Sequence, residues 1–241
     1  MPKLVYDEIF QDLKERIEKG QYLPEGMLPS ENELTAIYNC SRNTIRRAIS
    51  MLTAIGYTQP VHGKGVHIIY TPPKPHQRFY DLNSISGLCQ AGQENNFKVE
   101  NKVLTFTDMQ VDARLAEKSG FEEGLPVYFI QRLRFVEGDA KMLDTSFLRK
   151  DLLTGLTKER LSGSLFQFIE ESGITIQTVK RFVTMEKVTP MDEKYLSLDG
   201  YNTLAVVTSQ VYSTQGIQFE YTQSRNRPDL FAFSTVATRN V

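Results

Sequence analysis

The chain has 241 residues, 40% of them hydrophobic, and a formal net charge of -1 at pH 7. This composition supplies enough apolar residues for one large or two small cores, and the balanced charge excludes a protein that coats nucleic acid through net charge alone. No apolar run approaches the roughly 20 residues that cross a bilayer, and the first residues lack a signal-peptide pattern, so we expect neither membrane association nor secretion.

The first part of the chain has apolar residues at helical spacing. The first helix is predicted by apolar residues that recur every four positions before Gly20, at Val5, Ile9, Leu13 and Ile17. Ser30 with Glu33 three residues later forms a capping-box pattern and predicts the start of a second helix, which reaches Tyr38.

The segment 41–56 predicts a third helix with two contrasting faces. Its buried face is apolar and comprises Ile45, Ala48, Ile49, Leu52 and Ile55. The other face carries Arg42, Asn43, Arg46, Arg47 and Ser50, and no acidic residue occurs from Leu34 through Tyr70. Arginine and asparagine recognise guanine and adenine in the major groove, and the lack of carboxylates removes repulsion from phosphates. The alternative is an ordinary surface helix with solvated arginines.

Two short strands are expected within 57–70, around the turn His62-Gly63-Lys64-Gly65. The stretch TPPKPHQ that follows contains three prolines and predicts a semi-rigid spacer. We therefore expect a DNA-binding domain at 1–70, a linker at 71–78 and a second domain at 79–241.

The second domain shows strand periodicity. Five strands are predicted, at Pro126–Val136, Ala140–Leu148, Ile174–Val188, Thr203–Ser213 and Ile217–Arg225. Helical patches lie between them, at Val111–Ser119, Ser164–Ser172 and Met191–Leu198. The fold class is therefore α+β, with an antiparallel sheet.

Arg132 and Arg134 lie two residues apart on one predicted strand, so both can bind the same anion. Ser164 opens a helix whose first turn suits an oxyanion, and Ser84 and Ser86 could act in the same way in another turn. Asp144 could accept hydrogen bonds from sugar hydroxyls, or it could be the ion-pair partner of the arginines. Further polar candidates follow near the end of the chain, at Glu220, Arg225, Asn226 and Arg227.

The segment LPSENELTAIYNCSRNTIRRAISMLTAIGYTQPVHGKGVHI resembles the winged helix-turn-helix of GntR-type bacterial transcription regulators. The resemblance implies contacts with double-stranded operator DNA at Arg42, Asn43, Thr44, Arg46, His62, Gly63 and Lys64. Ser30 and Ser41 stand at the helix starts, and Asn32 occupies a position where some members have an arginine. Arg47 joins this DNA-binding set through its place on the arginine face.

From about Phe79 to Phe233 the chain resembles the effector domain of the HutC subfamily, whose fold is similar to chorismate lyase. The segments that carry the resemblance are QRLRF, MLDTSFL, GSLFQFIEESGI and SRNRPDLFAF. It implies that Arg132, Arg134 and Ser164 hold a phosphate, that Asp144 binds the sugar, and that a loop contributes at Ser84, Ile85 and Ser86. Phe166 and Asn226 stand where some relatives have tyrosines.

Two segments, LDTSFLRKDLLTGLTKERL and FEYTQSRNRPDLFAF, are most similar to trehalose-operon repressors of Gram-positive bacteria. This implies trehalose 6-phosphate as the effector, a symmetric homodimer on DNA, no cofactor and no catalytic residue. Three alternatives remain open, namely a regulator of another phospho-sugar, a sensor of an amino acid or fatty acid, and a lyase-like enzyme. Because the chain has only two cysteines, Cys40 and Cys89, and three histidines, we expect reduced thiols, no metal site and a cytoplasmic location.

Overall fold

The computed structural model describes residues 5–22, 26–72, 88, 92, 96–230 and 235–237. The chain divides into two compact units, the first formed by Met1–Gln77 with Thr235–Val241 and the second by Arg78–Ser234. Within the described ranges, no helix combines the length and the apolar character needed to cross a bilayer. Residues 73–78 of the predicted linker lie outside the described residues.

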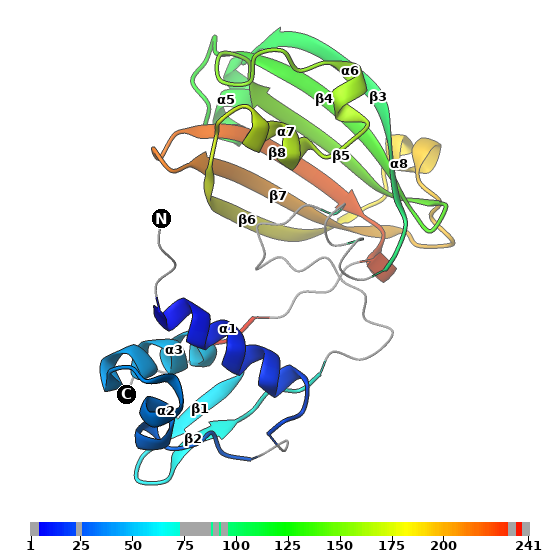
Figure 1. Cartoon of the computed structure of the whole chain (residues 1–241). Helices are drawn as coiled ribbons and strands as arrows, with labels where there is room; N and C mark the ends of the chain where they lie inside the picture. Colours follow the sequence, from blue (N-terminus) through cyan, green and yellow to red (C-terminus); the bar gives the residue numbers. More distant parts are fainter. Residues whose placement is uncertain are drawn as a thin grey trace. The chain divides into compact units, whose positions relative to one another are not determined.

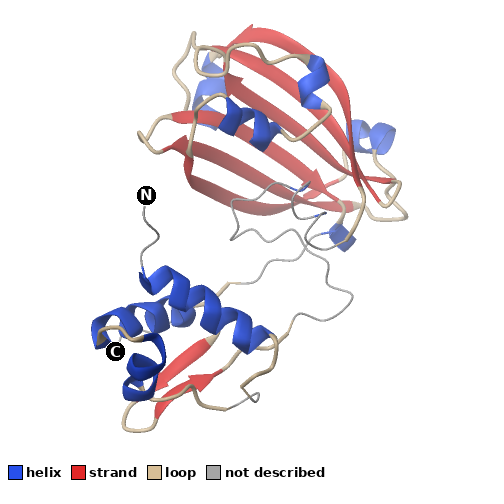
Figure 2. Cartoon of the chain, viewed as in Figure 1, coloured by secondary structure: helices blue, strands red, loops and turns tan. Residues whose placement is uncertain are grey.

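In its described residues, the first unit has three helices and an antiparallel hairpin (Figure 2). The elements are α1 (Val5–Glu18), α2 (Glu31–Tyr38), α3 (Arg42–Ala54), β1 (Thr58–Val61) and β2 (Gly65–Ile68). The predicted capping box is present, because Ser30 Oγ accepts a hydrogen bond from the backbone N–H of Glu33 and the Glu33 carboxylate accepts one from the N–H of Ser30. The core of this unit lies between the helices and includes Leu13, Leu34, Ile45, Ala48 and Leu52.

The end of α3 differs from the sequence expectation. Ile55 was expected on the buried face but is 40% exposed, because α3 ends at Ala54 and Ile55 no longer follows the helical period. Gly56 comes next with a φ of 75°, a left-handed conformation that glycine adopts readily. A Cβ at Gly56 would lie 2.6 Å from a methyl group of Val236, so the chain segment 235–237 packs closely on this turn.

The second unit is built on a six-stranded antiparallel sheet with the strand order β3-β4-β5-β8-β7-β6 (Figure 1). The strands are β3 (Val99–Gln110), β4 (Pro126–Val136), β5 (Asp139–Arg149), β6 (Ile176–Lys187), β7 (Thr203–Ser213) and β8 (Gln218–Asn226). The sequence did not predict β3, whose register shifts between Val103 and Thr105, so that it lacks a continuous two-residue period. The α+β class with an antiparallel sheet is confirmed.

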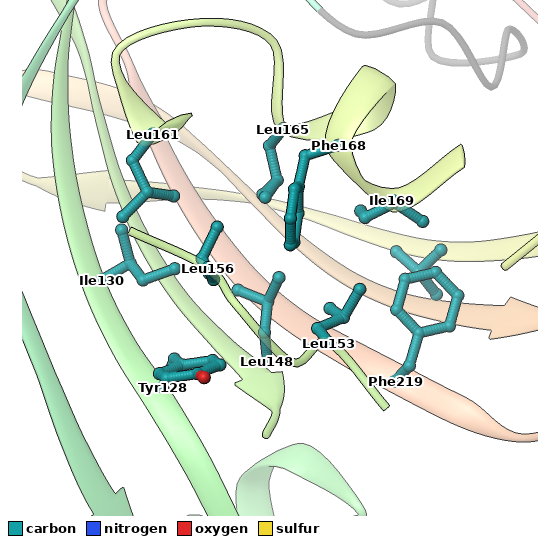
Figure 3. Close-up of a cluster of buried hydrophobic side chains, with 11 residues drawn as sticks. Tyr128, Ile130, Leu148, Leu153, Leu156, Leu161, Leu165, Phe168, Ile169 and Phe219 are labelled. Carbon is teal, nitrogen blue, oxygen red and sulfur yellow. The ribbon is translucent and has the colours of Figure 1, made fainter. Parts of the chain in front are cut away.

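Short helices cover parts of both sheet faces. They are α5 (Ala113–Ser119), α6 (Lys158–Leu161), α7 (Leu165–Glu171), α8 (Pro190–Tyr195) and the 3-10 turn η1 (Pro228–Leu230). Figure 3 shows Phe168 of α7 above Leu148 of β5, Ile169 of α7 on the side of Phe219 of β8, and Ile130 of β4 beside Leu161 of α6. This hydrophobic cluster occupies part of the sheet face that α7 covers, and polar strand residues occupy another part of the same face.

Candidate functional site

The predicted DNA-binding helix, α3, has the two faces that its sequence implies. Ser41 caps it by accepting a hydrogen bond from the N–H of Thr44, at 3.2 Å. Its apolar side is buried in the core of the first unit. Its opposite side is exposed and carries Arg42, Asn43, Arg46 and Arg47.

Two of these arginines are oriented by neighbouring helices. Arg46 Nε lies 2.9 and 3.0 Å from the two carboxylate oxygens of Glu31 in α2, although its side chain remains 62% exposed. The guanidinium of Arg47 lies 3.8 Å from the ring centroid of Tyr6 in α1. Both contacts restrict the rotamers of side chains that stay accessible, so the arginine face is partly ordered before anything binds.

The other predicted DNA-binding residues surround this face. Ser30 and Ser41 use their hydroxyl groups at the helix starts, where the Ser30 hydroxyl also donates to Glu33 at 2.8 Å and contributes to lowering the pKa of that carboxyl. Thr44 is half-buried. Asn32 is exposed in the first turn of α2, and the turn between β1 and β2 exposes His62, Gly63 and Lys64.

The second unit contains a cavity of about 60 Å³ on the sheet face covered by α7. Alternate residues of five strands line it, because side chains two apart on a strand share a face. Their charged and polar members are Arg132, Arg134, Asp144, Arg181, Ser209, Glu220, Thr222, Ser224 and Asn226. The apolar residues that line it include Leu88, Met142, Leu165, Phe166 and Val211.

Asp144 is the centre of the charged groups. Its carboxylate lies 2.7 Å from Arg134 Nε and 3.8 Å from Arg132 NH2, and it accepts a hydrogen bond of 2.6 Å from the Ser224 hydroxyl. The Arg132 and Asp144 side chains are 3% and 4% exposed, so this ion pair is buried. The ion-paired strand face considered from the sequence is therefore present, and it forms a wall of the cavity.

Glu220 is the second buried carboxyl group of the cavity. Its Oε1 accepts a hydrogen bond of 2.6 Å from the Thr222 hydroxyl, and its Oε2 has no hydrogen-bond partner among the described residues. Burial raises the pKa of Glu220. Three guanidinium groups, those of Arg132, Arg134 and Arg181, line the cavity together with the carboxyl groups of Asp144 and Glu220.

This chemistry suits an anion that also carries hydroxyl groups. Guanidinium groups bind phosphate and carboxylate through paired hydrogen bonds, while the serine, threonine and carboxyl side chains can exchange hydrogen bonds with hydroxyl groups. Throughout the described ranges, no group of three or more His, Cys, Asp and Glu side chains is placed to hold a metal ion.

Most of the predicted effector residues lie together. Arg132, Arg134, Asp144, Phe166, Glu220 and Asn226 all line the cavity. Ser164 caps α7 by accepting a hydrogen bond from Gln167 N at 3.3 Å, and it is not among the lining residues, although the next residue is. The predicted loop residues Ser84, Ile85 and Ser86 lie outside the described residues.

Arg225 lies on the opposite face of the sheet. Its Nε is 2.9 and 3.0 Å from the carboxylate oxygens of Asp192, and its NH1 binds Glu186. The strand period explains this placement, since Ser224 and Asn226 point into the cavity and the residue between them must point away. Arg225, which the sequence suggested as an effector-binding residue, therefore does not line this cavity.

Four polar cavity residues were missed in the sequence, namely Arg181, Ser209, Thr222 and Ser224. A signal for two of them was available. In β8 the alternate positions 220, 222, 224 and 226 are all polar. Alternate residues of a strand point to the same face, so this pattern indicates a polar site on one face of the sheet. Arg181 lies on a strand that is far from the arginine pair in sequence, and only the strand order brings it near.

The comparisons with known proteins agree with both units. Residues 5–68 match the family model of bacterial regulatory proteins of the gntR family, and residues 94–232 match the UTRA domain. The transcriptional regulator TreR of Bacillus subtilis is 32% identical over 96% of both chains, and the regulator GmuR of the same organism is 27% identical over 97% of this chain and 98% of its own. The crystal structure of the possible regulator YydK from Bacillus subtilis has a TM-score of 0.77 over 98% of this chain and all of its own, at 23% identity. The effector-binding domain of the Bacillus subtilis trehalose repressor has a TM-score of 0.53 at 26% identity and covers 59% of this chain and 99% of its own. The chain therefore belongs to the GntR family of bacterial transcription regulators and carries a UTRA effector domain of the HutC type.

Proposed function

We propose that this regulator represses transcription by binding operator DNA through the exposed face of α3 and the β1–β2 turn, and that a phosphorylated sugar releases it. The observation that carries the effector class is the cavity lined by three guanidinium groups and two carboxyl groups, of which Glu220 has its pKa raised by burial. A phosphate dianion matches this excess of positive charge, and sugar hydroxyls match the serine and threonine side chains around it.

Trehalose 6-phosphate is the first candidate effector. The support is the 32% identity to TreR over nearly the full length of both chains, together with the similarity to the effector-binding domain of the trehalose repressor. The cavity chemistry supports the phosphate and the hydroxyl groups but does not rank one sugar phosphate above another.

We infer that the cavity changes to an opened form when the effector enters, because the guanidinium groups that would bind a phosphate are paired with Asp144 in this structure. The phosphate would take over the guanidinium groups that now bind Asp144, and the freed carboxylate would accept hydrogen bonds from sugar hydroxyls. An effector that binds only the opened form shifts the population towards that form.

Release of DNA follows if the opened form changes the spacing of two recognition helices. In a symmetric homodimer the two copies of α3 enter successive major grooves of a palindromic site, about 34–36 Å apart. The effector lowers operator affinity only to the extent that it binds the opened form more tightly than the DNA-binding form.

Calorimetric titration with trehalose 6-phosphate tests this proposal, with trehalose and glucose 6-phosphate in parallel. Saturable binding of trehalose 6-phosphate alone supports both the phosphate site and the ligand. Tighter binding of glucose 6-phosphate keeps the phosphate site and rejects trehalose 6-phosphate, and binding of none of the three rejects the sugar-phosphate proposal. Chromatography of the recovered ligand shows whether it was turned over, which would support the enzyme alternative.

A further inference from the structure

A second pocket of the effector domain lies beside α5 and has a volume of about 310 Å³. Residues of β3, α5, β5 and β8 line it, and Leu115 of α5 also packs against Val127 and Tyr221 of the sheet. Small-molecule sites in proteins usually measure about 300–1,000 Å³. The pocket is therefore large enough for a small organic molecule.

The alternation of strand side chains separates this pocket from the effector cavity. Thr222 of β8 lines the effector cavity, whereas its neighbours Tyr221 and Gln223 line the second pocket. Asp144 and Thr145 of β5 are divided between the two sites in the same way. Because neighbouring residues of a strand point to opposite faces, the two sites lie back to back on the same sheet.

Aromatic rings form part of the floor of the second pocket. Phe147 of β5 is directly opposed to Tyr221 of β8, and their ring centroids are 6.1 Å apart. Phe129 of β4 extends this row, because it is opposed to Phe147 with the ring centroids 5.3 Å apart. Phe147 is half-buried, so part of its ring stays accessible to a ligand. An aromatic ligand would gain both apolar burial and ring packing on this floor.

The wall that α5 contributes is basic. Arg114 and Lys118 lie one helical turn apart, and both are exposed and line the pocket. Neither has an ion-pair partner among the described residues. In the described lining the one carboxylate is that of Asp112, which caps α5 by accepting a hydrogen bond of 2.7 Å from the N–H of Leu115. The pocket therefore combines an aromatic floor with an excess of positive charge at one wall.

We propose that this pocket binds a small aromatic carboxylate, with its ring on Phe147 and Tyr221 and its carboxylate on Arg114 and Lys118. A guanidinium group binds a carboxylate through two parallel hydrogen bonds, and an ammonium group adds a further donor. A cationic ring compound would be repelled by this wall, and an uncharged one would leave both cations without a partner. The inference goes beyond the proposed function and does not depend on it, because the two sites are separate.

A fluorescent probe, 2-naphthoate, tests the ligand class with the full-length protein. The chain has no tryptophan, so naphthalene fluorescence can be followed without interference from the protein. Fluorescence anisotropy should show saturable binding of 2-naphthoate. The amide 2-naphthamide keeps the rings without the charge and should bind about tenfold more weakly, since hydrogen bonds to charged groups are the stronger ones. Equal binding of the two probes, or no saturable binding of 2-naphthoate, would overturn the proposal.

Three variants test the location of the probe. Arg114→Met should weaken binding of 2-naphthoate about tenfold and leave binding of 2-naphthamide unchanged, because only the charged contact is lost. Phe147→Leu should weaken the binding of both probes, because it removes the ring on which they pack. Arg160→Met is the matched control, since it removes an exposed arginine from α6, which packs on the other face of the sheet, and it should change neither affinity. Binding of 2-naphthoate that Arg114→Met and Phe147→Leu leave unchanged, or that Arg160→Met weakens equally, would overturn the site.

Discussion

Asp144 and Glu220 are carboxyl groups in one cavity, but their surroundings differ. Asp144 is bound by the guanidinium of Arg134 and by the hydroxyl of Ser224. Glu220 has a single hydrogen bond, from Thr222, and burial raises its pKa. The two groups therefore offer an effector different chemistry, since the first is an acceptor and the second, when protonated, is also a donor.

Glu220→Gln should stabilise the protein increasingly as the pH rises. The folded-state pKa of Glu220 is raised, so its favourable contribution is fully present below the unfolded value of about 4.3 and is lost as the pH passes the folded value. Glutamine keeps the shape and never ionises, which gains about 1.4 kcal/mol for each unit by which the pKa is raised. Urea unfolding of both proteins between pH 4 and pH 9 measures this gain, and a difference that does not vary with pH would contradict the prediction.

Arg132→Met should abolish the response to the sugar phosphate while operator binding persists. The guanidinium of Arg132 lines the cavity, whereas methionine fills a similar volume without hydrogen bonds to phosphate. Arg149→Met is a matched control, because Arg149 is paired with Asp151 outside the cavity. Fluorescence anisotropy of labelled operator measures the effector concentration that is needed to release the DNA. This concentration should be at least tenfold higher for Arg132→Met than for Arg149→Met, a difference of about 1.4 kcal/mol. Equal responses would remove Arg132 from the effector site.

At the scale of elements, α2 depends strongly on its cap because it has only eight residues. Ser30→Ala removes both capping hydrogen bonds of the side chain and should cost about 1 kcal/mol of stability in the first unit. Ser50→Ala is the control, since Ser50 is exposed in the middle of α3, where alanine has the higher helix propensity. Urea unfolding monitored by circular dichroism compares the two variants, and equal midpoints would show that the cap contributes little.

We expect the contact between α2 and α3 to affect DNA binding as well. Glu31 neutralises part of the charge of Arg46, so Glu31→Gln should tighten binding to mixed-sequence DNA and make it more sensitive to salt. One additional phosphate contact changes the slope of log K against log salt by about 0.9. Glu8→Gln in α1 removes the same charge from another exposed position and should change the slope less. A slope that Glu31→Gln leaves unchanged would show that Arg46 does not gain a phosphate contact.

The sequence predicted most elements because their signals are local. The bounds expected for β4 and β7 match those in the structure, since each strand is a run rich in β-branched and aromatic residues between turns. β3 was missed because a register shift interrupts its period. The cavity was predicted only in part, because the partners of Arg132 on β6 and β7 are set by strand order, which no local pattern encodes.

At the scale of the whole molecule, the two units have separate cores. Leu13 and Leu52 belong to a cluster confined to the first unit, and Ile130 and Phe168 belong to one confined to the second. We expect two unfolding transitions, because each core can be lost without the other. Ser30→Ala should shift one transition, and a bound sugar phosphate should shift the other through mass action. Differential scanning calorimetry measures both, and a single transition that responds to both changes would show that the units unfold together.

The segment Thr235–Val241 belongs to the first unit, and Val236 packs on Gly56 at the end of α3. The chain therefore passes from one unit to the other twice, and the effector domain is in effect an insertion within the DNA-binding unit. A proteolytic cut in the first crossing would therefore leave the rest of the first unit attached to the effector domain only through noncovalent contacts such as that of Gly56 with Val236.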